Sequence, residues 1–477
     1  MSSQQTLRIG LCGIGLEAYW EQFANLKPTL EGYVESVAVH LEKTTGAELH
    51  NRGLIDTAPR AREAGHAFRR ADIDILFLYV TTYALSSTVL PLVQRAGVPV
   101  VVLNLQPQAA IDYAAFNQLP NRTAMTEHWL AYCSACPVPE IANVLMRAVI
   151  PFHQVTGVLN EEHTWKEIED WARVARVKKD LSENRLGLLG HYYNGMLDIM
   201  TDVTQICITF GTHIEIVEVD ELSALRSQVS EAEISQRVAD FNSVFDIQPD
   251  CPAEELARAA RTSVALDRFV DIYDLHSLAY YYKGSGVPAN EDTMSSIILG
   301  TSLLTGRHIP VAGEYEVKNA IAMKIMDSLG AGGSFTEYYA IDFADDLVLL
   351  GHDGPGHIAI AEGRTKVRPL QVYHGKVGRG LSVEMSVCYG PVTLLSVVED
   401  TKSKFKLLVA EGESVPGPIL QIGNTNSRYR FPIGARGFIE SWNAQGPAHH
   451  CAVGIGHVAY TLEKLASMLG IGYYKVC

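Results

Sequence analysis

The chain has 477 residues and a formal net charge of −15 at pH 7, with 47% hydrophobic and 19% charged residues. This balance is ordinary for a globular protein with room for about two to four domains. The acidic excess argues against nucleic acid and against an anionic membrane surface as partners. The sequence contains no apolar run of about 20 residues, so we expect a cytoplasmic protein without a membrane span.

The first part of the chain alternates between apolar strands and helical patterns. Strands are predicted at 7–12, 48–54, 73–80 and 98–105, and helices at 17–42, 59–70 and 84–96. Buried strands that alternate with helices indicate a parallel, doubly wound sheet. We therefore predict a Rossmann-like α/β domain over residues 1–157, with Pro28 interrupting its first helix.

A glycine turn follows the first strand. Gly13 and Gly15, together with Ala18, formally match a dinucleotide-binding fingerprint, which makes an NAD-binding dehydrogenase the rival hypothesis. No acidic residue about 20 positions further on ends a second strand, as ribose binding requires. We interpret the glycines as a tight turn at the carboxyl edge of the sheet, where ligands commonly bind.

The cysteines give little functional signal. All eight are scattered along the chain and predict no disulfide framework. Cys133 and Cys136 are the only close pair, and no histidine lies at ligand spacing beside them. We interpret them as free, packed thiols.

A second α/β domain is predicted over residues 158–328. It opens with a charged helix at 161–179 and a strand at 185–189. A glycine-bounded loop rich in hydrogen-bonding side chains follows, and its His191 is a candidate ligand contact. The competing interpretation of His191 is a structural or solvated histidine.

Two carboxylates and a histidine lie close together in the sequence between residues 311 and 357. Glu314 stands at the entrance of a helix whose apolar residues recur at about 3.6-residue spacing. If the following hairpin is centred between Ala344 and Asp345, Glu337 faces His352. Opposed side chains in such a pair have Cβ atoms about 5 Å apart, close enough to bind one ion. The alternative is a surface hairpin with a Glu–His pair.

A paired-histidine turn follows more than a hundred positions later, at His449 and His450. Two carboxylates with two imidazoles and no thiolate suit Mn²⁺, Co²⁺ or Mg²⁺ better than a structural zinc. Short strands and turns dominate this part of the chain. We predict a β-rich, antiparallel barrel-like domain over residues 329–477 that carries most of the metal ligands.

Four motifs in this region resemble the L-arabinose isomerase family. They are AGE at 312–314, GGSFTEYY at 332–339, LLGH at 349–352 and AHH at 448–450. The family has AGE, GGTSF-x-E-x-Y, LGSH and GGAHH in the same order. The resemblance implies a manganese-dependent aldose–ketose isomerase, with L-arabinose to L-ribulose as the main reaction and D-galactose to D-tagatose as a further one. An L-fucose or D-arabinose isomerase, or a non-catalytic sugar-binding protein, remains an alternative.

The resemblance also implies roles for individual residues. The implied metal ligands are Glu314, Glu337, His352 and His450. Glu314 and Glu337 would double as acid and base through a cis-enediol, and a hydride shift fits the same ligands. The expected sugar contacts are Tyr19, His191, Tyr339 and His449. The family further implies a homo-oligomer, a trimer or hexamer, whose active sites are shared between subunits.

Overall fold

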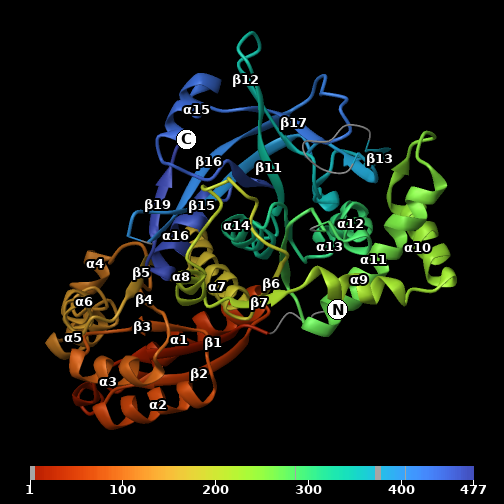
Figure 1. The fold of residues 1–477 in the computed structure, drawn as a ribbon. Coiled ribbons are helices and arrows are strands. Elements are labelled where there is room, and N and C mark those ends of the chain that lie inside the picture. Colours follow the sequence, from red (N-terminus) through yellow and green to blue (C-terminus); the bar gives the residue numbers. More distant parts are fainter. Residues whose placement is uncertain (1–5, 285, 371–377, 403) are drawn as a thin grey trace. The chain divides into compact units, whose positions relative to one another are not determined.

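The computed structural model describes residues 6–284, 286–370, 378–402 and 404–477 (Figure 1). These residues form two compact units, one up to Lys179 and the other from Asp180 to Cys477. The division into three domains, with boundaries after residues 157 and 328, stays a prediction. Among the described helices, none combines the length and the apolar character that a membrane crossing needs.

The first unit contains a five-stranded parallel sheet in the order β2-β1-β3-β4-β5. Its strands are β1 Arg8–Ile14, β2 Glu48–Ile55, β3 Ile75–Val80, β4 Val100–Gln106 and β5 Phe152–Val158. The predicted parallel α/β arrangement is confirmed. The Rossmann-like detail is not, because a Rossmann sheet has the order 3-2-1-4-5-6, whereas 2-1-3-4-5 is the other common doubly wound order.

Both faces of this sheet are covered. Leu76, Leu78 and Val80 pack into a core cluster with α2 (Ala58–Arg70), α3 (Ser86–Ala96) and α6 (Val138–Arg147). Ile75 and Phe77 point to the other face and are equally buried, because successive side chains of a strand alternate. Burial on both faces explains why the strands are continuous apolar runs in the sequence.

The chain after β1 differs from the prediction. Glu17–Tyr19 forms one short 3-10 turn, and the helix α1 covers Leu26–Thr45. Pro28 lies in the first turn of α1, where backbone N–H groups have no helical partner, so it interrupts nothing. A Cβ at Gly13 would lie 2.4 Å from the Val34 side chain on α1. Close helix packing therefore accounts for Gly13.

The second unit begins with a four-stranded parallel sheet in the order β10-β9-β6-β7. Its strands are β6 Arg185–Leu189, β7 His213–Val217, β9 Ser277–Tyr280 and β10 Val311–Ala312. The carboxyl ends of β6, β9 and β10 lie at one edge, which is where open α/β sheets bind ligands. The segments that leave this edge begin at residues 190, 281 and 313.

Six antiparallel strands of the second unit close into a barrel in the order β15-β18-β11-β12-β17-β16, with β16 paired back to β15. They are β11 Gly332–Asp342, β12 Leu347–His352, β15 Gly390–Glu399, β16 Phe405–Val415, β17 Thr425–Arg430 and β18 His450–Ile455. β19 (Gly472–Lys475) adds to β16 in parallel. The predicted antiparallel barrel is confirmed.

One helix packs closely against this barrel. α14 (Val317–Ser328) contacts β11, β15 and β18. Gly333 and Gly454 make room for it, since a Cβ at either position would lie 3.0 Å or less from Met326. α14 thus holds the segment just before it, which contains Glu314, against the β11–β18 pair.

The remaining described elements complete the two units. The other helices are α4 Tyr113–Phe116, α5 Arg122–Leu130, α7 Glu162–Ser182, α8 Val203–Phe210, α9 Val219–Ser227, α10 Glu231–Val244, α11 Ala253–Tyr273, α12 Pro288–Met294, α13 Ile298–Gly306, η2 Ile358–Ile360, α15 Gly434–Asn443 and α16 Ala459–Leu469. A small sheet pairs β8 Asp246–Ile247, β13 Lys366–Pro369 and β14 Leu381–Glu384.

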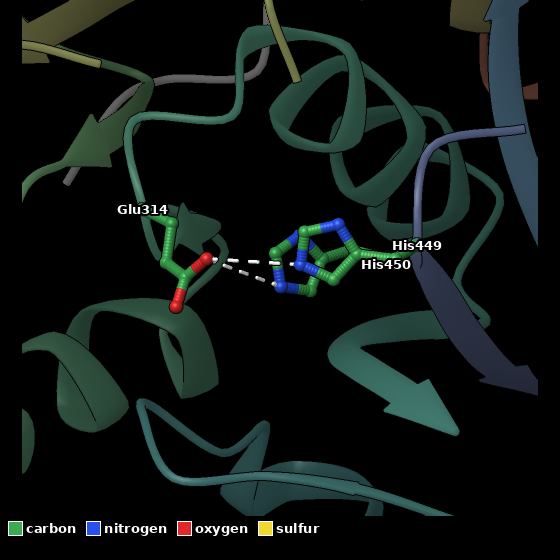
Figure 2. A group of neighbouring side chains, drawn as sticks. All are labelled: Glu314, His449 and His450. Carbon is green, nitrogen blue, oxygen red and sulfur yellow. Dashed lines mark ion pairs between the residues drawn. The ribbon is translucent and has the colours of Figure 1, made fainter. Parts of the chain in front are cut away.

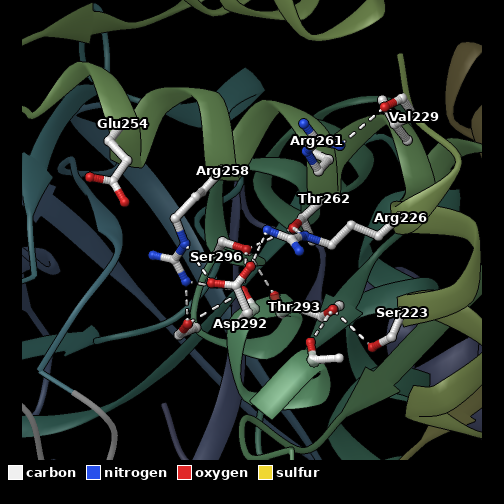
Figure 3. Close-up of polar contacts among 12 residues, drawn as sticks. Ser223, Arg226, Val229, Glu254, Arg258, Arg261, Thr262, Asp292, Thr293 and Ser296 are labelled. Atoms are coloured by element: carbon white, nitrogen blue, oxygen red, sulfur yellow. Dashed lines mark hydrogen bonds and ion pairs between the residues drawn. The ribbon is translucent and has the colours of Figure 1, made fainter. Parts of the chain in front are cut away.

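A partly buried ionic network ties α9, α11 and α12 together (Figure 3). Asp292 on α12 accepts a hydrogen bond from Arg258 Nε on α11 at 2.8 Å and pairs with Arg226 Nη2 on α9 at 2.6 Å. Arg226 Nε also donates to Thr262 at 2.8 Å. Each guanidinium group already donates to several acceptors. We therefore interpret the network as structural and not as an anion-binding site.

Candidate metal centre

Glu314 stands on strained backbone at the carboxyl end of β10. Glu314 and Tyr315 have φ angles of 57° and 61°, a left-handed conformation that bulky residues rarely adopt and that clusters at functional sites. Tyr315 N donates to Tyr280 O at 2.9 Å, and Glu316 N donates to Gly313 O at 3.1 Å. These bonds hold the turn that projects the Glu314 side chain.

The strand pairing brings Glu337 to His450. In the antiparallel β11–β18 pair the two residues are directly opposite each other. On β12 the partner of Glu337 is Gly351, so the predicted pairing with His352 is wrong by one residue. A bulge between Tyr338 and Ala340 causes the shift, because the extra residue of a bulge displaces all pairs beyond it. Nearer the turn, the pairs follow the predicted register.

Three ligand atoms converge at this place (Figure 2). Oε2 of Glu314 lies 3.7 Å from His450 Nε2 and 3.8 Å from His449 Nε2. One potential ligand atom from each of these three residues lies within 4.8 Å of the other two. A carboxylate oxygen with two imidazole nitrogens suits a divalent transition metal ion.

A buried carboxylate orients His450. Glu316 Oε2 pairs with Nδ1 of His450, and only 1% of each residue is exposed. A carboxylate accepts, so Nδ1 carries a proton, and the ring presents Nε2 to Glu314. Among the described residues, Nε2 has no hydrogen-bond partner. Metal-binding histidines show this arrangement, a carboxylate on one ring nitrogen and the other nitrogen open.

Glu316 is absent from the sequence-based prediction. Its only sequence signal is its place two residues after Glu314, at the entrance of α14. It thus belongs to the same short segment as a predicted ligand. Its partner lies 134 positions away, so the pairing needs the tertiary structure.

His449 is held in a different way. Asp198 Oδ2 accepts from the ring Nδ1 of His449 at 2.6 Å and from its backbone N at 2.9 Å. Burial opposes a charge on this ring, but the nearby Glu314 carboxylate and the hydrogen bond to Asp198 outweigh it and raise the pKa of His449 to about 9. Burial also opposes ionisation of Asp198, yet the His449 hydrogen bonds lower the pKa of Asp198. Without a metal ion, the pair is charged at neutral pH.

Glu337 approaches the same imidazole. Its Oε2 lies 4.0 Å from His449 Nε2. Burial raises the pKa of Glu337, and the positive charge of nearby histidines only partly opposes this rise. A carboxyl group with a raised pKa takes up and releases protons closer to neutral pH than an exposed one.

His352 lies beside the group of three. Its ring centroid is 5.1 Å from that of His450 and 4.4 Å from that of Phe335, and only 2% of the residue is exposed. A Cβ at Gly313 would lie 3.5 Å from its Cε1 atom, so this glycine leaves room for the ring. That Glu314, Glu337, His352 and His450 bind one ion stays a prediction.

Comparison with known proteins found related sequences. Residues 332–472 match the family model of the L-arabinose isomerase C-terminal domain. The chain is a divergent L-arabinose isomerase-like protein. Aldose–ketose isomerase is the enzyme class that its likenesses support.

The relatives of this L-arabinose isomerase-like chain are distant. It is 23% identical over 350 residues to an L-arabinose isomerase from a Nocardioides species, covering 69% of this chain and 67% of the relative. It is 22% identical over 346 residues to an L-arabinose isomerase from Yersinia pseudotuberculosis, covering 68% of this chain and 66% of the relative. A sugar transporter protein from Legionella pneumophila matches with a TM-score of 0.14 and 10% identity, too weakly to carry an argument.

The sugar contacts expected in this L-arabinose isomerase-like chain lie on different elements. Tyr339 sits at the bulge of β11, where its hydroxyl accepts a hydrogen bond from Asn424 Nδ2 at 3.2 Å. Burial raises the pKa of Tyr339, so its hydroxyl stays protonated. His191 is exposed after β6, with its ring 4.3 Å from that of Tyr281. Their contact with a sugar stays a prediction.

Tyr19 belongs to the first unit. It lies in the 3-10 turn after β1, and its ring centroid is 6.1 Å from that of Phe23. The turn stands at the carboxyl end of β1, beside the point where the strand order reverses between β1 and β3. Such reversal points favour ligand binding, and a contact between Tyr19 and a sugar stays a prediction.

Proposed function

We propose that this L-arabinose isomerase-like chain is a divalent-metal-dependent isomerase that converts L-arabinose to L-ribulose, with D-galactose to D-tagatose as a further reaction. The observation that carries the proposal is the approach of two carboxylates to one imidazole nitrogen. Glu314 and Glu337 lie 3.8 and 4.0 Å from His449 Nε2. Two carboxylates at one position can supply the base and the acid for proton transfer between adjacent carbons.

The donor set supports a metal ion. Glu314, Glu337, His352 and His450 would hold it, and the open Nε2 of His450 favours this assignment. Oxygen and nitrogen donors without thiolate favour Mn²⁺, with Co²⁺ or Mg²⁺ as substitutes. A bound ion would supply Lewis-acid polarisation of the sugar oxygens at carbons 1 and 2.

The side chains account for the proton movements. One carboxylate removes the proton from the carbon next to the carbonyl group and returns it to the neighbouring carbon, through a cis-enediol. The other carboxylate moves the hydroxyl proton between the two oxygens. Glu337 suits either task because burial raises its pKa. Protonated His449 can donate a hydrogen bond from Nε2 to an oxygen on which negative charge develops.

The proposal extends to the setting of the enzyme. We propose a cytoplasmic homo-oligomer, a trimer or hexamer, whose active sites contain residues from neighbouring subunits. Its partner is a small sugar, with no nucleic acid and no membrane. An L-fucose-type or D-arabinose-type isomerase is the second candidate, because the same carboxylate and imidazole groups serve any aldose whose carbons 1 and 2 reach them.

A panel of aldoses tests the proposal. Chelator-treated protein is offered L-arabinose, D-galactose, L-fucose and D-arabinose, with and without Mn²⁺, and ketose formation is followed. We expect L-arabinose to be converted only when Mn²⁺ is present. Conversion of L-fucose or D-arabinose alone would replace the substrate, and no conversion with Mn²⁺, Co²⁺ or Mg²⁺ would refute the proposal. A fluorescence titration with NADH tests the dehydrogenase alternative, and we expect no binding.

A further inference from the structure

The segment around Asp198 makes contact with His449 from outside the barrel. Asp198 comes from the loop after β6, 251 positions before His449. The backbone N–H and the ring Nδ1–H of His449 both donate to the same oxygen of Asp198. Two donors of one residue on a single acceptor fix the ring as well as the main chain, and they leave Nε2 directed at Glu314.

Lys318 also holds the segment around Asp198, through its main chain. Its Nζ donates to the carbonyl oxygen of Asp198 at 2.6 Å and to that of Met200 at 3.2 Å. Only 5% of Lys318 is exposed, and it is the second residue of α14. A buried ammonium group is costly, and a cation is unfavourable at a helix N-terminus. The position of Lys318 therefore does not stabilise its own helix.

Apolar packing fixes this segment only in part. Ile199 is fully buried, but Leu197 and Met200 are 75% and 43% exposed. A cavity of about 490 Å³ adjoins the segment, and Asp198, Thr201, Lys318 and Glu399 are among its lining residues. Because one side of the segment faces open space, hydrogen bonds rather than close packing must set the position of the Asp198 carboxylate.

From these contacts we infer that Asp198 and Lys318 are positioning residues that together orient His449, an inference that rests on the proposed function. Lys318 fixes the main chain at residues 198–200, and Asp198 in turn fixes the tautomer and direction of the imidazole. The entrance of α14 thereby serves both histidines. Glu316 orients His450 directly, and Lys318, two residues later, orients His449 through Asp198.

Hydrogen–deuterium exchange on metal-free protein tests the first step. Lys318→Met removes the two hydrogen bonds to the segment while keeping a long apolar side chain. We expect the backbone amides of residues 196–201 to exchange at least tenfold faster. The matched control is Lys324→Met on the same helix, whose ammonium pairs with Asp327 at 3.9 Å. Unchanged exchange in Lys318→Met, or an equal increase in both variants, would overturn the role of Lys318.

A double-mutant cycle tests the second step. Asp198→Ala should weaken Mn²⁺ binding about tenfold or raise the KM for the sugar by a similar factor, as loss of a carboxylate partner of a site histidine does. In a His449→Ala background, Asp198→Ala and Lys318→Met should have no further effect, because both act through the missing ring. Additive losses, or no effect of Asp198→Ala on either quantity, would overturn the inference.

The experiments can refute the proposed isomerase function and the positioning role of Asp198 and Lys318 separately. If no aldose is converted but the exchange result and the Mn²⁺ cycle are as expected, the substrate assignment is wrong and the positioning role stands. If a sugar is converted and the cycle is additive, the isomerase stands and the positioning role is wrong. Thermal unfolding of each variant shows whether it has kept its fold.

Discussion

The carboxylate of Glu316 pairs with Nδ1 of His450, and neither side chain is open to solvent. This pair fixes the proton of the ring on the nitrogen that faces away from Glu314. Glu316→Gln keeps an acceptor of the same shape but removes its charge. We expect Mn²⁺ affinity, measured by calorimetry on chelator-treated protein, to fall by about 10- to 100-fold.

A second buried glutamate provides the control for that change. Glu384 pairs with Arg368 at 3.1 Å and is also almost fully buried. Glu384→Gln should reduce the stability of the fold but leave Mn²⁺ affinity unchanged. Equal Mn²⁺ affinity in Glu316→Gln and the unaltered protein would show that Glu316 has no part in the centre.

The role of Glu337 is tested by Glu337→Gln. The amide cannot take up a proton at neutral pH, so we expect the rate of aldose conversion to fall by at least 10³-fold, near the upper range for loss of a general base. Circular dichroism should show an intact fold, because Glu337 is only partly buried. Activity close to that of the unaltered enzyme would remove Glu337 from the mechanism.

Replacing His449 and replacing His450 should affect Mn²⁺ affinity to different degrees. The Nε2 atom of His450 is buried beside Glu314 without a hydrogen-bond partner in the described part of the chain. His450→Ala should therefore lower Mn²⁺ affinity more strongly than His449→Ala does. The measurement is the Mn²⁺ concentration that restores activity after chelation. The reverse ranking would make His449 the ligand in place of His450.

Breaking the ionic network of Figure 3 should lower the stability of the fold. Asp292→Ala leaves Arg226 and Arg258 buried without their shared carboxylate. Breaking a buried pair on one side costs about 3–5 kcal/mol, and we expect about 3 kcal/mol in urea unfolding because Asp292 is partly exposed. Asp240→Ala removes an exposed carboxylate from Arg237, which keeps its pair with Asp267, and should cost less than about 1 kcal/mol.

Titration of His153 should make the stability of the fold depend on pH. Its ring stacks on Trp171 with centroids 4.0 Å apart, and burial lowers its pKa from 6.5 to about 4. The unfolded chain therefore binds a proton that the folded chain does not between these pH values, so stability falls as pH decreases from 6.5 toward 4. His153→Gln should flatten this part of the stability curve. An unchanged slope would show that another group titrates there.

The sequence alone determined the chemistry-bearing segments and the class of fold. Continuous apolar strands between helices predicted a parallel sheet, because strands covered on both faces need apolar side chains at every position. The motifs around Glu314, Glu337, His352 and His450 marked the segments from which ligands are expected, and their binding of one ion stays a prediction. These signals are local, since each depends on residues within a few positions of one another.

Only the tertiary structure determined which side chains contact one another in the candidate site. The bulge near Tyr339 changed the cross-strand neighbour of Glu337 to Gly351, and neither composition nor spacing marks a bulge in this strand. Glu316 and Asp198 meet their histidines across 134 and 251 positions, and a lone carboxylate in a sequence does not reveal which ring it contacts. The closure of the barrel and the docking of α14 bring these groups together, because packing over long distances in the chain, not local pattern, sets which polar atoms share a buried site.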